Sequence, residues 1–68
     1  MLKRSKVPQV LSAIRYLEST QEISSEESEQ LVCGIQKFLK TKDDEPFLYQ
    51  LNMLGKVANV GEIMNVLN

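Results

Sequence analysis

The sequence predicts an all-α fold, a small bundle of about four helices per chain. Two observations favour this class. Apolar residues recur at intervals of three and four positions, which places them on one face of a helix, and residue types that suit helix N-termini precede these stretches. A third observation is negative, because no segment shows the alternation of apolar and polar residues that a half-buried strand requires.

The first helix is expected at residues 6–19. Pro8 suits its first turn, where a proline removes no intrahelical hydrogen bond. The basic residues Lys3, Arg4 and Lys6 come just before it, and we expect them to form a solvated N-terminal arm. A membrane-surface helix is the alternative, but acidic residues close the amphipathic stretch. The apolar residues of this helix are Val7, Val10, Leu11, Ile14 and Leu17.

A second helix is expected from Ser25 to about Lys40. The hydroxyl of Ser24 can cap its N-terminus while Glu27, three residues later, reaches back to the Ser24 backbone, the reciprocal arrangement called a capping box. Lys37 and Lys40 lie near its C-terminal end, where cations complement the helix dipole. Its apolar face consists of Leu31, Val32, Ile35, Phe38 and Leu39.

Two shorter helices complete the pattern after a charged loop at residues 42–46. The third helix is expected to begin around Pro46 and to stop at Gly55, with Phe47, Leu48, Leu51 and Leu54 forming its stripe. Asn59 and Glu62 repeat the capping-box spacing and predict a fourth helix that runs to the end of the sequence.

Composition narrows the possible functions. The 68 residues allow one domain, which we assign to residues 1–68. With no His and one Cys, the chain lacks the ligands of a usual zinc site and the base of a Cys-His or Ser-His arrangement, so we expect no enzyme and no cofactor. A net charge of -1 without a basic patch disfavours nucleic acid. No apolar run approaches the ~20 residues of a membrane span, and a cytoplasmic location is expected.

Two small residues stand out in the second helix. Gly34 costs roughly 1 kcal/mol relative to alanine there, so we expect either a close helix crossing, for which a second copy of the chain is one partner, or a solvent-facing position. Cys33 is expected to be a small buried residue; the alternative is an exposed reactive thiol.

The charges are ordered along the chain, although they nearly cancel in total. Five carboxylates lie within twelve residues without an intervening cation, namely Glu18, Glu22, Glu26, Glu27 and Glu29. Such a block can steer a basic partner and make its binding depend on salt. The alternative is that the carboxylates only complement the positive end of the helix dipole.

A chain of this length removes only ~60% of its unfolded surface from water when it folds alone, so its stability as a monomer is marginal. We therefore expect a symmetric homodimer. The dimer interface is predicted at Val10, Ile14 and Leu17 of the first helix with Phe38 of the second. A self-sufficient four-helix monomer is the alternative.

Several segments together resemble a known family. Ala13–Leu17, a short polar spacer, Ile23–Glu26, Glu29–Leu31 and Gly34–Gln36 follow one another as they do in the N-terminal domain of small glutamine-rich tetratricopeptide-repeat co-chaperones. The segments Met53–Lys56 and Gly61–Asn68 are also similar to members of that family.

The resemblance implies a homodimerisation domain whose acidic face binds the basic ubiquitin-like domain of a protein that targets tail-anchored proteins. It also implies that the chain is the N-terminal part of a longer co-chaperone, whose repeats bind chaperones. The partner-binding residues that it implies are Glu26, Glu29 and Leu31, with Glu27 beside them, and Lys37 departs from the family pattern by adding a cation to this face. A purely structural oligomerisation domain with a solvated acidic surface is the alternative.

Overall fold

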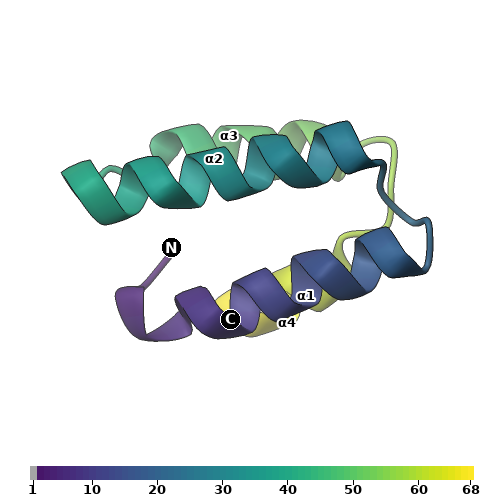
Figure 1. The fold of residues 1–68 in the computed structure, drawn as a ribbon, viewed down its shortest axis with the longest axis horizontal. Helices are drawn as coiled ribbons and strands as arrows, with labels where there is room; N and C mark the ends of the chain where they lie inside the picture. Colours follow the sequence, from purple (N-terminus) through teal and green to yellow (C-terminus); the bar gives the residue numbers. More distant parts are fainter. Residues whose placement is uncertain (1) are drawn as a thin grey trace.

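The computed structural model describes residues 2–68. It contains a 3-10 turn, η1 (Arg4–Lys6), and four α-helices: α1 (Val7–Ser19), α2 (Ser25–Thr41), α3 (Glu45–Leu54) and α4 (Gly61–Leu67). No strand occurs among the residues described, so the all-α prediction is confirmed. The helices form two layers, α2 with α3 and α1 with α4, as Figure 1 shows.

The capping box predicted for the second helix is present. Ser24 is the N-cap of α2, and its Oγ accepts a hydrogen bond from the backbone N–H of Glu27 at 3.1 Å. The Glu27 carboxylate in turn accepts from the backbone N–H of Ser24 at 2.7 Å. These two bonds fix the first residue of α2.

The N-terminal arm differs from its prediction. Lys3, Arg4 and Lys6 are exposed to solvent, as expected, but Leu2 is buried with 3% of its surface exposed. The backbone N–H of Leu2 also donates to the carboxylate of Asp44 at 3.2 Å, across the loop between α2 and α3. The arm is therefore docked on the bundle. The sequence did not reveal this docking, because a single leucine among charged residues forms no periodic pattern.

The predicted capping box of the fourth helix does not form. Val60, not Asn59, is the N-cap of α4, and it makes no side-chain capping bond. The side-chain oxygen Oδ1 of Asn59 accepts a hydrogen bond from the backbone N–H of Gly61 at 3.0 Å, which closes a local turn before the helix. Burial of Val60, 8% exposed, accompanies this later start.

The interior lies between the two layers and draws on every helix. Val10, Ile14, Phe47 and Ile63 are fully inaccessible to solvent. Phe47 from α3 and Ile14 from α1 are the two largest of the fully buried side chains, so the core joins segments that are distant in sequence. The remaining buried apolar residues are Leu2, Val7, Leu17, Ile23, Leu31, Ile35, Leu51, Leu54 and Val60.

Gly34 marks a close crossing, which was one of the two possibilities left open. A Cβ at Gly34 would lie 2.9 Å from Cα of Phe47, closer than real Cβ atoms approach a backbone. The helix that approaches it is α3 of the same chain. The glycine therefore allows α2 and α3 to pack into one layer, and it needs no second copy to account for it.

Candidate functional site

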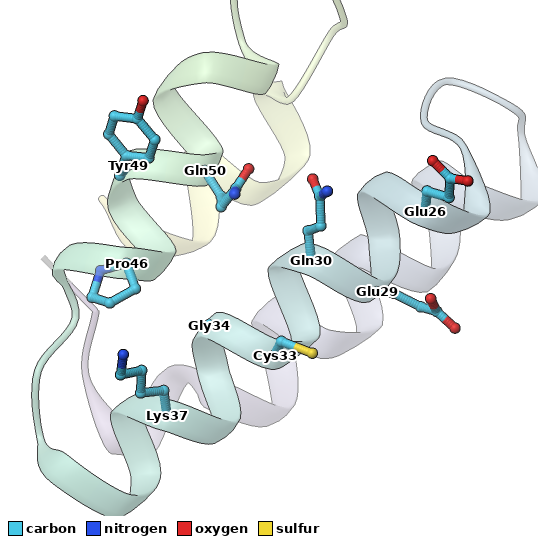
Figure 2. A pocket seen from close by; sticks show the side chains of 9 residues that line it. All are labelled: Glu26, Glu29, Gln30, Cys33, Gly34, Lys37, Pro46, Tyr49 and Gln50. Carbon is cyan, nitrogen blue, oxygen red and sulfur yellow. The ribbon is translucent and has the colours of Figure 1, made fainter.

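A groove runs along the outer side of the layer formed by α2 and α3. Its volume is about 480 Å³, and Gln30 of α2 and Gln50 of α3 project from its two walls (Figure 2). The side chains at its rim are charged, polar and aromatic, and none belongs to the core. The lining residues are Glu26, Glu29, Gln30, Cys33, Gly34, Lys37, Pro46, Tyr49 and Gln50.

Helical spacing produces the α2 wall. Glu26, Gln30, Cys33 and Lys37 follow one another at intervals of three or four, so they share one face of α2. Leu31 lies on the opposite, inward face. Packing of Leu31 and Ile35 into the core turns the face with these four residues outward.

The two carboxylates that the resemblance singled out lie at one end of this groove. Glu26 and Glu29 are both exposed, and they project from the N-terminal part of α2 in different directions (Figure 2). Among residues 2–68, the carboxylates of the acidic block that accept hydrogen bonds are those of Glu18 and Glu27. Glu26 and Glu29 thus offer solvent-accessible negative charge.

The other two predicted partner-binding residues do not line the groove, but both line a hollow next to it. Leu31 is 1% exposed and is part of the core, so it presents almost no surface to a partner. Glu27 is partly buried, and its carboxylate is occupied by the Ser24 backbone. Glu27 also lines a separate hollow at the turn between α1 and α2, together with Glu18 and Glu22. The structure therefore divides the acidic block into two groups.

Lys37 lines the same groove as the acidic pair. Figure 2 shows its side chain extending toward Pro46, at the opposite end of the groove from Glu26. The groove consequently has negative charge at one end and positive charge at the other. A uniformly basic ligand is favoured only at the Glu26 end.

Cys33 is exposed, and the prediction that it is buried is wrong. Its position on α2 explains the difference. Gly34 and Ile35 occupy the inward face, which leaves Cys33 among the groove residues Gln30 and Lys37. The small and apolar neighbours of Cys33 suggested burial, but the burial of a helical residue depends on the face of the helix that it occupies and not on its neighbours in sequence.

The α3 wall was not anticipated. On α3, Tyr49 is 64% exposed and Met53, one turn later, is 44% exposed; Val57, in the turn that follows α3, is 79% exposed. A second hollow next to the groove contains Met53 and Val57 and shares Gln30 and Gln50 with it. The spacing of these three residues in the sequence was a signal that could have identified an apolar stripe beside the groove.

The residues predicted for the dimer interface lie mostly inside the single chain. Val10 and Ile14 are completely buried, and Leu17 is 2% exposed. Phe38 is partly buried and packs against the core. The stripe of α1 is covered by the other helices of its own chain, so in this fold it has no free surface for a second copy.

The groove is suited to binding. It combines two carboxylates, two amides, a thiol and an ammonium group. Among residues 2–68, no three His, Cys, Asp or Glu side chains gather in a way that could hold a metal ion.

Within the same residues, each helix is too short or too polar to cross a membrane. Comparisons with family models, with curated proteins and with solved structures found no match to this chain.

Proposed function

We propose that this chain is a protein–protein interaction module that binds a basic partner through Glu26 and Glu29 and that forms a homodimer. The observation that carries the proposal is the exposure of both carboxylates at one end of the α2–α3 groove. The partner class that we propose, from the resemblance to the co-chaperone family, is the basic ubiquitin-like domain of a tail-anchored-protein targeting factor.

The surroundings of the acidic pair support a protein ligand. Interfaces combine exposed aromatic and Met side chains with a charged rim, and aromatic residues often contribute most of the binding energy. Tyr49 and Met53 supply such side chains on α3, beside the groove that Glu26 and Glu29 line on α2. Acid pair and apolar stripe thus lie on one side of the molecule.

The position of Lys37 sets the direction in which a basic ligand would lie. Its ammonium group repels cations at the far end of the groove, so the positive charges of the partner are expected over Glu26 and Glu29. An uncharged or acidic part of the partner is expected over Lys37. Affinity should fall as salt rises, because the attracting charges are exposed.

The test is a titration of the chain with a basic ubiquitin-like domain at two salt concentrations. Replacing both Glu26 and Glu29 with Lys should abolish binding, and Glu29→Lys alone should weaken it by about tenfold or more. Glu62→Lys is the matched control, since it makes the same charge change on exposed α4, and it should leave the affinity nearly unchanged. Equal affinities for the double variant and the native chain would exclude the proposed site.

A purely structural oligomerisation domain is the second candidate. It is favoured by the use of Glu27 in the α2 cap and of Glu18 as acceptor from the Ser25 hydroxyl at 3.1 Å, since these carboxylates serve the fold itself. Under this candidate no basic partner binds, and the charge reversals at Glu26 and Glu29 change no affinity.

A further inference from the structure

We propose that the exposed face of α2 is an interface with α2 of a second copy, packed antiparallel about a two-fold axis at Cys33. The proposal deepens the homodimer part of the proposed function and rests on it. It replaces the covered stripe of α1 with a surface that is open in the folded chain.

The charges along this face are arranged symmetrically about Cys33. Glu29 lies four residues before Cys33 and Lys37 four residues after it. Glu26 lies seven residues before it and Lys40 seven residues after it. All five residues are exposed, and spacings of four and seven return to one face of a helix, so they form a single stripe on α2.

In an antiparallel two-fold dimer, this arrangement places opposite charges of the two copies against each other. Each residue before the axis then faces the residue that lies the same number of positions after it in the other copy. Glu29 faces Lys37 of the partner subunit, and Glu26 faces Lys40 of the partner subunit. Both pairs occur twice, and a parallel arrangement would instead place carboxylate against carboxylate.

Polar residues border the charged stripe on both sides. Gln30 and Gln36 lie three residues before and after Cys33, on opposite flanks of the stripe, and both are exposed. From Glu26 to Lys40 the stripe is about 21 Å long. Leu31 and Ile35 point into the core and Gly34 packs against Phe47 at the edge of the stripe, so the five exposed residues of the stripe are left uncovered.

The same charges also couple self-association to the binding of a basic partner. The partner subunit's Lys37 and the partner subunit's Lys40 would neutralise the carboxylates that we assign to a basic ligand. Self-association and binding of a basic partner therefore compete for Glu26 and Glu29. Because the pairs are exposed ion pairs, the dimer is salt-sensitive, and a basic partner shifts the chain toward the monomer.

The single cysteine permits a direct test. With the axis at Cys33, the two thiols of a dimer lie opposite each other, and diamide can oxidise them to a disulfide: the thiols lose two protons and two electrons, and the diazene accepts them as a hydrazine. At micromolar concentration and low salt, the native 68-residue chain should give mostly covalent dimer. Adding 0.5 M NaCl, roughly enough to screen exposed pairs, should reduce the yield several-fold.

Charge swaps examine the register. Glu29→Lys and Lys37→Glu each place like charges opposite one another, so each should lower the rate of cross-linking by about tenfold. The double variant, Glu29→Lys with Lys37→Glu, restores opposite charges and should restore the native rate. Circular dichroism establishes that the variants fold. Unchanged rates in the single variants, or a double variant no faster than they are, would overturn the proposed interface.

One variant separates this interface from the partner site. Lys37→Glu should lower the rate of cross-linking by about tenfold while it preserves or strengthens binding of a basic ubiquitin-like domain, since it removes the repelling cation from the groove. Loss of cross-linking with retained partner binding supports both proposals. Native cross-linking in Lys37→Glu contradicts the interface alone, and absence of partner binding in the native and variant chains contradicts only the partner site.

Discussion

Gly34 of α2 lies against Phe47 of α3 so closely that a Cβ on the glycine would come within 2.9 Å of the Phe47 Cα. Phe47 itself is completely buried, and it is the largest of the fully buried side chains. The contact therefore sets the distance between the two helices at the centre of their layer. It also positions Pro46 and Tyr49, which line the groove on the same helix.

Gly34→Ala should destabilise the protein despite the better helix propensity of alanine. The propensity gain is about 1 kcal/mol, whereas overpacking a close backbone contact costs about 1–3 kcal/mol, so we expect a net loss of about 1 kcal/mol. Thermal unfolding measures it, with a decrease in Tm of about 5 °C. Gly61→Ala is the control, because only the exposed Asn59 side chain is near its Cβ, and a variant of Gly34 more stable than native would contradict the crossing.

Ser24→Ala should remove one half of the capping box. Loss of the bond from the Glu27 N–H to Ser24 Oγ is expected to reduce the free energy of unfolding by about 1 kcal/mol. Urea denaturation measures this difference. Ser12→Ala, at an exposed position within α1, is the matched control and should be neutral or slightly stabilising. Equal stability of the Ser24 and Ser12 variants would show that the cap contributes nothing.

Ile14→Val should reveal whether the stripe of α1 serves the core or an interface. Removing one methyl group from this fully buried side chain should cost about 1 kcal/mol. Because the contacts lie within one chain, the loss should be the same at 5 and at about 100 μM protein, roughly a twentyfold range over which dimer stability would change. Val57→Ala, 79% exposed, is the control. A loss that grows with dilution would instead support an interface formed by α1.

Asp44→Ala should release the N-terminal segment. Without the acceptor for the Leu2 N–H, the docked form loses about 1 kcal/mol, which corresponds to about a fivefold rise in the open population. Trypsin cleavage after the exposed Arg4 and Lys6 should accelerate by the same factor. Mass spectrometry measures the cleavage rate. Glu45→Ala, the next residue, is the comparison, and an identical cleavage rate in Asp44→Ala would show that the hydrogen bond does not hold the segment.

Local signals in the sequence predicted most of the secondary structure. The Ser24–Glu27 box and the proline near the start of α1 placed two helix starts within a residue, because these signals act through adjacent backbone groups. The Asn59–Glu62 spacing, by contrast, predicted a capping box that does not form. It has the local form of a cap, but packing of Val60 into the core moved the helix start, and packing is not a local property.

The candidate site was only partly predictable. Glu26 and Glu29 could be placed on an exposed part of α2 from the sequence, since their charge and their helical position are visible there, and both line the groove. Leu31 was assigned to the same surface, although its phase on the helix turns it inward. Tyr49 was missed, because nothing local shows that α3 lies beside α2.

Four helices, a capped start for α2 and a block of carboxylates could all be predicted from the sequence, because periodicity, capping and charge act over a few neighbouring residues. Three relations became visible in the folded chain alone. The apolar stripe of α1 is buried by its own chain, Gly34 packs against Phe47, and Glu26 lines one groove with Lys37 and Tyr49. These relations join residues far apart in the chain, and they exist only once the helices have packed into two layers.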